Sequence, residues 1–300
     1  MDHPRGAISL VTDSSCDLPL QLLERFKIAV VPLTVHLGTE SYPDGALSTE
    51  AFWRKAAESG SVPRTSRPSV GVFEGVFEGL VEGGRQVLCI TLTGKHTGTV
   101  ETARLAARRF GDAVRVFDSH SLSLGLGFQV LEAAQASDLG CSMEEILELL
   151  EEVRSSVHGF VVLDTLEYVR RGGRADALVA VIGRMSRVLS VKPIVNFVEG
   201  RVQLLSVVRS FRRGFERVLC TVEELSPVER LAVMHTQNPE AAEGFADRLA
   251  ERFSFPRADI LVGETGTVVA SHAGAGAVGV FAVSRRPRRG AREGGLRRQS

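Results

Sequence analysis

Short apolar runs rich in β-branched residues alternate with segments of helical periodicity along the chain. The first run, residues 7–12, is followed by Asp17 as a candidate helix N-cap and by Pro19 in the first turn of that helix. Apolar residues in the segment 69–80 recur every three or four positions, which predicts a helix that packs one face on a sheet. Such alternation of strands and helices is typical of α/β domains with a largely parallel sheet.

The rest of the chain follows the same pattern. An antiparallel hairpin is predicted around the turn Glu199-Gly200, because two runs of alternating polarity flank it. We expect strands at 87–91, 114–117, 160–163, 231–235, 268–271 and 278–283, and the two hairpin strands at 194–198 and 202–207. We expect helices at 48–59, 98–110, 125–139, 143–157, 211–225 and 239–253.

The composition changes at His158-Gly159, which divides the chain into two predicted domains. Residues 1–159 are expected to form an N-terminal, Rossmann-like α/β domain with a mainly parallel sheet, and residues 160–284 a C-terminal α/β domain with a mixed sheet. Residues 285–300 carry seven Arg and one Glu without hydrophobic periodicity, so we expect a disordered, Arg-rich tail.

Charge and cysteine content narrow the functional classes. Lys and Arg number 36 and balance 36 Asp and Glu, so no overall positive field attracts nucleic acid, and no specific nucleic-acid partner is expected. The 4 cysteines lie far apart and have no spacing suited to zinc or to a disulfide framework. The N-terminus has no secretory signal pattern and no apolar stretch approaches about 18 residues, so we expect a cytoplasmic protein without a transmembrane segment.

Common catalytic and cofactor motifs are missing from the sequence. It contains no Walker phosphate loop, no nucleophile elbow and no H-E-x-x-H zinc motif. The segment 274–279 matches G-x-G-x-x-G, but an apolar strand follows it where a dinucleotide site needs a helix. We therefore expect neither a metal nor a cofactor.

Hydroxyl groups and free backbone N–H groups follow three of the predicted strands. They lie at 13–15, 93–98 and 118–119, and the ligands of open α/β sheets gather at the carboxyl ends of strands. Gly98, near a helix start, is suited to present N–H donors to an anion. Each Ser or Thr taken alone can equally be a helix cap, and Asp13 can equally be a cap or part of a structural network.

Six ordered motifs together resemble one known family. They are V-T-D-S-S-C-D-L-P at 11–19, T-S-R-P-S at 65–69, T-G-T at 97–99, F-D-S at 117–119 with G-L-G at 125–127, L-E-Y-V-R-R-G-G-R at 166–174, and S-H-A-G-A-G at 271–276. Over residues 8–283 the chain resembles the DegV family of bacterial fatty-acid-binding proteins. In some bacteria these carriers present acyl chains to a fatty-acid kinase.

The resemblance implies two α/β domains with a single long-chain fatty acid, such as palmitate, bound between them. The carboxylate-binding residues of the family correspond to Thr65 and Thr97 in this sequence. Gly98, Thr93 and His272 are further candidates for binding the carboxylate. Thr97 stands where the family has Ser, which keeps a hydroxyl and adds a methyl group. The sequence departs from the family at two other positions. Ala275 stands in place of Pro, and Arg67 stands where the family often has Gln. The side chain of Arg67 either adds positive charge near the carboxylate or points to solvent.

The energetics of burying a carboxylate and an acyl chain agree with the roles that the resemblance implies. A carboxylate that leaves water needs donors, because an unpaired buried charge is very costly, and Thr65, Thr97 and the Gly98 N–H can supply them. An acyl chain of about 16 carbons gains roughly 0.8 kcal/mol per buried CH₂, on the order of 10 kcal/mol in total. The tail should therefore supply most of the affinity, although sequence cannot separate a tail pocket from ordinary core.

Several alternatives stay open at this point. His272 is either a neighbour of the carboxylate or acyl phosphate, or a hydrogen-bonded loop residue. Arg170, Arg171 and Arg174 either contact a partner or a phosphate, or form a solvated helix end beside Gly172-Gly173. The preferred function is a lipid-binding carrier that is not itself an enzyme. Its expected partners are a long-chain fatty acid and a separate ATP-dependent fatty-acid kinase, with transient membrane contact. The alternatives are an acyl hydrolase or phosphotransferase that uses His272 with Thr97 or Ser119, and a nucleic-acid accessory protein acting through the Arg-rich tail.

Overall fold

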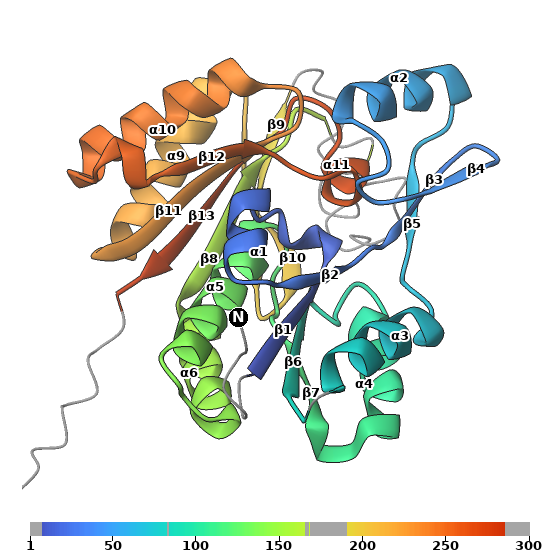
Figure 1. The fold of residues 1–300 in the computed structure, drawn as a ribbon. Coiled ribbons are helices and arrows are strands. Elements are labelled where there is room, and N and C mark those ends of the chain that lie inside the picture. The colour runs from blue at the N-terminus through green and yellow to red at the C-terminus, as the bar shows by residue number, and fades with distance from the viewer. Residues whose placement is uncertain (1–7, 83, 166–167, 169–190, 286–300) are drawn as a thin grey trace, which may run out of the picture.

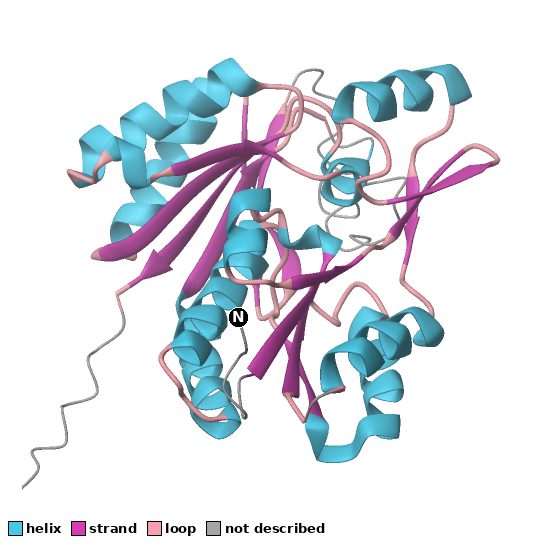
Figure 2. Cartoon of the chain, viewed as in Figure 1, coloured by secondary structure: helices cyan, strands magenta, loops and turns pink. Residues whose placement is uncertain are grey.

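The computed structural model describes residues 8–82, 84–165, 168 and 191–285. Arg170, Arg171, Arg174 and most of the Arg-rich tail lie outside the described residues, so the expectations for them stay predictions. Within the described part the predicted fold class is confirmed, because helices and two large sheets alternate across the molecule (Figure 2).

The first large sheet has the strand order β2-β1-β6-β7, and every neighbouring pair is parallel. Its two faces are covered by helices, α3 and α4 on one side and α5 and α6 on the other (Figure 1). The bounds are β1 Ile8–Asp13, β2 Ala29–Val31, β6 Gln86–Thr91, β7 Val114–Asp118, α3 Val70–Val81, α4 Thr99–Ala107, α5 Leu124–Asp138 and α6 Met143–Ser156.

The second large sheet is mixed, with the order β10-β9-β8-β13-β11-β12. Only β11 and β12 run parallel, and the predicted hairpin is the antiparallel pair β9 and β10. Helices α9 and α10 cover its outer face, while α5 lies against its inner face. The bounds are β8 Val157–Val162, β9 Lys192–Val198, β10 Arg201–Val208, β11 Val228–His235, β12 Leu261–Glu264, β13 Val278–Ser284, α9 Phe211–Glu224 and α10 Pro239–Phe253.

Helix α5 joins the two sheets and is buried nearly all round, as expected for a helix packed on both sides. Its first turn lies so close to neighbouring segments that only glycine fits. A Cβ on Gly125 would come 3.1 Å from Cδ1 of Phe281 in β13, and a Cβ on Gly127 would come 2.8 Å from the carbonyl oxygen of Cys16. The two sheets are therefore held together through the backbone of this helix.

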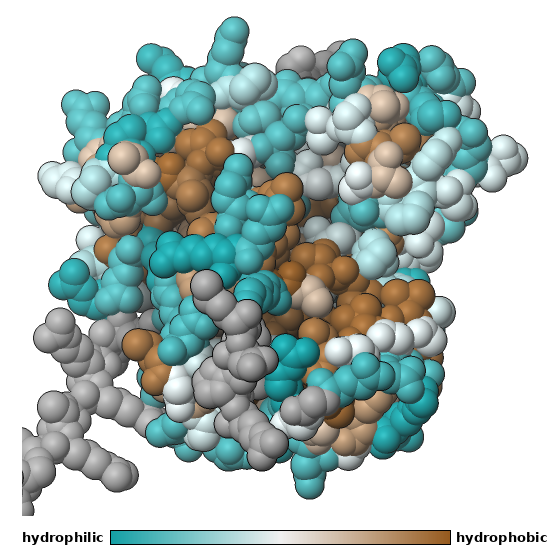
Figure 3. All heavy atoms as spheres, viewed as in Figure 1, coloured by the Kyte–Doolittle hydropathy of each residue, from teal (hydrophilic) through white to brown (hydrophobic). Residues whose placement is uncertain are grey.

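A small third sheet, which the sequence pattern does not predict, has the order β4-β3-β5. It lies beside α2 and the short helix α11, at one side of the molecule (Figure 1). On the face seen in Figure 3, hydrophobic side chains gather over β2 and the neighbouring α3. The bounds are β3 Thr34–Leu37, β4 Glu40–Pro43, β5 Arg64–Ser66, α2 Thr49–Ser59, α1 Leu20–Arg25 and α11 Thr267–Ala273.

Two local predictions are wrong. The segment 268–271, expected as a strand, lies in α11, where Ser271 Oγ donates to the carbonyl of Thr267 at 2.6 Å and four residues are buried. Packing between the sheets thus outweighs the β-propensity of its two valines. Asp17, expected as the N-cap of the first helix, adopts a left-handed conformation instead, and Pro19 is the N-cap of α1.

Membrane-spanning helices and metal-binding clusters are both absent from the described residues. In the described part of the chain, no helix is both long and apolar enough to cross a membrane. Nor do the described His, Cys, Asp and Glu side chains form a group of three or more suited to a metal ion.

Candidate functional site

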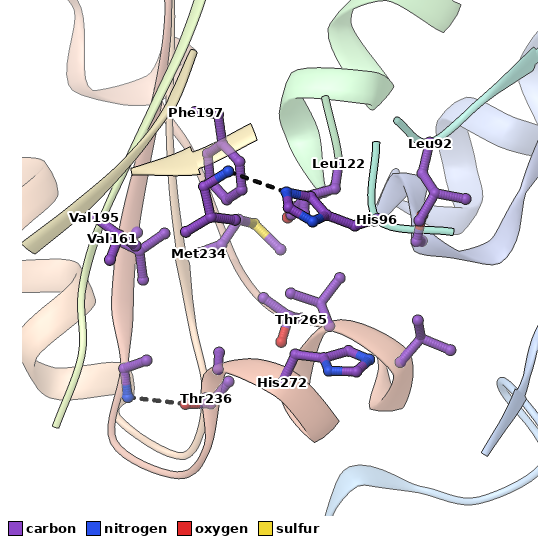
Figure 4. A pocket seen from close by; sticks show the side chains of 18 of the residues that line it. Leu92, His96, Leu122, Val161, Val195, Phe197, Met234, Thr236, Thr265 and His272 are labelled. Atoms are coloured by element: carbon purple, nitrogen blue, oxygen red, sulfur yellow. Dashed lines mark hydrogen bonds between the residues drawn. The ribbon is translucent and has the colours of Figure 1, made fainter. Parts of the chain in front are cut away.

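A cavity lies between the two large sheets and encloses about 1130 Å³ of empty space, its mouth included. Strands of the second sheet, the loops that follow the strands of the first sheet, and α11 supply most of its walls. Val161 and Val195 lie on one side of the cavity and Leu92 on the other (Figure 4). The described lining residues include no Asp, Glu, Lys or Arg, so the space is suited to a mainly apolar ligand.

The wall on the second sheet, which we call the tail wall, consists of Val161, Val195, Phe197, Gly279 and Phe281. The rings of Phe197 and Phe281 stack with their centroids 6.4 Å apart. Gly279 pairs with Val161 across β13 and β8, and a Cβ on this glycine would come 3.2 Å from Cγ2 of Val161. The missing side chain of Gly279 therefore adds room beside the phenylalanines.

The opposite part of the cavity, which we call the head-group end, carries Thr97 from the loop after β6 and His272 from the last turn of α11. Nε2 of His272 lies 2.8 Å from Oγ1 of Thr65, which comes from β5. Oγ1 of Thr97 lies 2.9 Å from Oγ1 of Thr99. Of the predicted residues, Thr97 and His272 thus line this end of the cavity, and Thr65, which is not a lining residue, contacts the imidazole of His272.

The other two predicted residues are placed differently. Thr93 lines the cavity, but its hydroxyl donates to the carbonyl of Gly200 at 2.9 Å, in the turn of the β9–β10 hairpin. Gly98 is the N-cap of α4 and is not among the lining residues. Thr93 therefore joins the loop after β6 to the β9–β10 hairpin, whereas Gly98 begins α4 directly after Thr97.

Sequence reasoning missed several lining residues. Nε2 of His96 accepts the backbone N–H of Val202 at 3.0 Å, so His96 and Thr93 together hold the hairpin (Figure 4). Thr236 Oγ1 donates to the carbonyl of Gly274 at 2.5 Å and accepts the N–H of Ala277 at 2.9 Å, which fixes the glycine-rich loop. The signal that could have found Thr236 is its place directly after β11, at a strand end like those already singled out.

Carboxylates behind the cavity hold its walls in place. The carboxylate of Asp13 accepts hydrogen bonds from the N–H and Oγ of Ser15 and from the N–H of Leu92. Burial raises the pKa of Asp13 to about 6, against the opposing effect of these hydrogen bonds. The network explanation for Asp13 therefore fits its geometry, because it positions Leu92 of the lining.

Asp17 links three segments that are distant in sequence. It accepts hydrogen bonds from Oγ of Ser123 at 2.5 Å and from the N–H of Gly266 at 2.8 Å, and burial raises its pKa to about 7. Asp44 accepts the hydroxyl of Thr267 at 2.6 Å. These two carboxylates thus anchor the start of α11, the helix that carries His272.

The sequence matches one protein family over nearly its whole length. The model of one family, described as "Uncharacterised protein, DegV family", matches residues 7–285. A DegV domain-containing protein of Streptomyces coelicolor is 33% identical over 286 residues, which are 93% of this chain and 99% of the relative.

Two solved structures are also similar. One, described as fatty acid binding of a DegV family protein from Thermus thermophilus, has 32% identity and a TM-score of 0.85, and the match covers 93% of this chain and 100% of the other. The other, described as DegV, a fatty acid binding protein from Bacillus subtilis, has 28% identity and a TM-score of 0.83, with coverage of 93% and 100%.

Proposed function

The chain belongs to the DegV family, and we propose that it binds one long-chain fatty acid in the cavity between its two large sheets. The observation that carries the proposal is the cavity itself, whose described lining is apolar except for hydroxyl and imidazole groups. The Thermus thermophilus and Bacillus subtilis relatives, which are described as binding fatty acids, support it.

In this proposal the carboxylate lies at the head-group end. The hydroxyl of Thr97 donates to it, and His272 donates through the ring, whose orientation Thr65 fixes by the 2.8 Å contact. Hydrogen bonds to a charged group contribute about 1.5–3 kcal/mol each. Thr93 acts less on the carboxylate than on the hairpin, because its hydroxyl is donated to Gly200.

The acyl tail lies against the tail wall in this proposal. Each methylene moved from water to that wall gains roughly 0.8 kcal/mol, so a chain of about 16 carbons gains on the order of 10 kcal/mol before the costs of binding. No direction is imposed by such contacts. The tail thus supplies affinity, and the head-group end fixes which way round the acid binds.

We further propose that the protein is a carrier for lipid metabolism that presents its acid to a separate ATP-dependent fatty-acid kinase. The sequence supports this division of labour because it contains no phosphate-binding loop of its own. Acyl-phosphate formation that needs ATP, a candidate kinase and this protein together would support the carrier role. Formation without this protein would contradict it.

The alternative, an acyl hydrolase using His272, has less support. The hydroxyl of Thr97 is paired with Thr99, and Ser119 donates its hydroxyl to the carbonyl of Ser121 and is not among the lining residues. Neither hydroxyl is bonded to the imidazole that would have to activate it, as nucleophilic catalysis requires. Release of acid from a long-chain thioester by the purified protein would favour the hydrolase.

Native mass spectrometry after mild purification tests the binding proposal. We expect an added mass equal to that of one fatty acid, lost on delipidation and regained when hexadecanoic acid is supplied. A protein that carries no acyl mass and takes up no hexadecanoic acid would contradict the proposal.

A further inference from the structure

The cavity poses a problem of charge. Its described lining includes no Asp, Glu, Lys or Arg, and a carboxylate moved from water into such a site is costly without a nearby positive charge. Hydroxyl donors reduce this cost but do not balance the charge. A cation directly behind the lining, close to Thr97, would do so.

Arg67 lies against Gly98, the residue that follows Thr97. Its Nη1 lies 1.7 Å from the point that a Cβ on Gly98 would occupy, and its Cζ lies 2.9 Å from it, so the guanidinium rests directly on this glycine. Gly98 follows Thr97 in sequence, and Arg67 follows Thr65 by two positions at the end of β5. The guanidinium therefore connects the two segments that supply the hydroxyls of the head-group end.

The conformation of Gly98 shows why glycine stands there. Its φ of −85° and ψ of 19° are open to other residues, so the backbone does not require glycine at this position. A Cβ at this position would overlap the end of the Arg67 side chain, so the guanidinium would have to move away from Gly98. Arg67 and Gly98 are thus a matched pair, in which the glycine lets the guanidinium approach.

Arg67 is also available for a ligand. Its side chain is exposed, and within residues 8–82, 84–165, 168 and 191–285 it forms no ion pair. Its planar guanidinium suits a carboxylate, which it can approach with more than one N–H.

We propose that Arg67 supplies the positive charge that selects an ionised head group, and that Gly98 is the residue that allows it to reach Thr97. This inference rests on the proposed fatty-acid binding. It assigns the specificity for the charged acid over a neutral lipid of equal length to the arginine that lies against Gly98.

The test compares hexadecanoic acid with 1-hexadecanol, which has the same chain and no charge. Affinities are measured by calorimetric titration for the parent protein, Arg67→Gln, Arg67→Lys, Gly98→Ala and the double variant. We expect Arg67→Gln to weaken binding of the acid roughly three- to tenfold, a size discounted for the exposure of the side chain, and to leave the alcohol unchanged. Arg67→Lys should keep most of the preference, because it keeps the charge.

Gly98→Ala should reproduce the effect of Arg67→Gln, and the double variant should be no worse than either alone. Lys95→Gln is the matched control, since Lys95 is an exposed cation of the neighbouring loop, and it should leave the preference unchanged. Equal affinity of parent and Arg67→Gln for the acid, or an equal loss for acid and alcohol, would overturn the role of Arg67 alone. Failure of the parent to bind the acid at all would overturn the proposed function and this inference with it.

Discussion

The tail wall and the head-group end of the cavity are built by opposite means. Val161, Val195 and Phe197 project from paired strands of the second sheet, where apolar contact has no preferred direction. Thr97 and His272 come from the loop and the helix that follow the strands, and each hydrogen bond there has a defined partner. In the proposed complex, non-directional contact sets how tightly the acyl chain is bound, whereas directional contact sets which end of it lies at which end of the cavity.

The largest effect should come from shortening the ligand. Decanoic acid has six fewer methylenes than hexadecanoic acid, and at roughly 0.8 kcal/mol each it should bind about a thousandfold more weakly. Calorimetric titration of the purified, delipidated protein with both acids measures this. A difference below about tenfold would show that the tail wall contributes little and would reverse the comparison.

Removing the hydroxyl of Thr97 tests the other end. Thr97→Val should weaken binding of hexadecanoic acid by about 1.5–3 kcal/mol, or roughly ten- to a hundredfold, with the fold intact. Thr65→Val should weaken it less, because Thr65 contacts His272 and does not line the cavity. Thr221→Val, on α9, is the control that should leave binding unchanged. Unchanged affinity in both site variants would remove these residues from the head-group end.

Gly279→Val tests where the tail ends. The new side chain takes the space of one or two methylenes beside Phe281, so octadecanoic acid should bind roughly four- to fifteenfold more weakly. Dodecanoic acid, which is too short to reach that space, should bind as before. Gly244→Ala, in an open position on α10, controls for the general effect of replacing a glycine. An equal loss for both acids would place the tail elsewhere.

The smallest effect on binding, but a clear one on stability, is expected from Asp17→Asn. The pKa of Asp17 is about 7 in the folded protein and ordinarily 3.8, so the stability linked to its protonation is complete below about pH 4 and is lost as the pH rises through about 7. Asn does not ionise, so the variant does not lose this stability as the pH rises. The free energy of unfolding of the variant should therefore rise relative to that of the parent between about pH 4 and pH 7, by up to about 1.4 kcal/mol per pH unit, and the difference should level off above pH 7.

Denaturant unfolding of both proteins at several pH values measures the difference. Burial lowers the pKa values of His158 and His235, which gives the opposite slope, but both histidines are present in parent and variant and cancel in the comparison. A difference between the two proteins that stays constant from pH 5 to pH 8 would contradict a raised pKa for Asp17.

Local signals in the sequence predicted most of the fold, and long-range contacts account for the misses. Helix α10 begins and ends at the predicted residues 239 and 253, because Asn238-Pro239 starts it and its apolar positions face one way. The strand predicted at 268–271 was wrong, because the segment packs against β3 and β5 and these long-range contacts favour a helix. The prediction that Asp17 is a helix N-cap was wrong for the same reason, because the groups that its carboxylate binds belong to residues 123 and 266, far away in the sequence.

The head-group end was partly predictable and the tail wall was not. Thr97 follows a predicted strand, whereas Thr65 and His272 were predicted from the motifs at 65–69 and 271–276 that resemble those of the DegV family. Val161, Val195 and Phe281 have the same character as the core residues next to them in the same strands. Only their position on the face toward the cavity distinguishes them, and that position depends on how the two sheets pack.

The orientation of the bound acid is the most direct test of this division. A crystal structure with 16-bromohexadecanoic acid locates both ends of the ligand, because bromine scatters anomalously. We predict the bromine beside Phe197 and Gly279, with the carboxylate within hydrogen-bond distance of Thr97 Oγ1 and His272. Bromine beside Thr97 with the carboxylate against the tail wall, or a cavity that holds no acid, would contradict it.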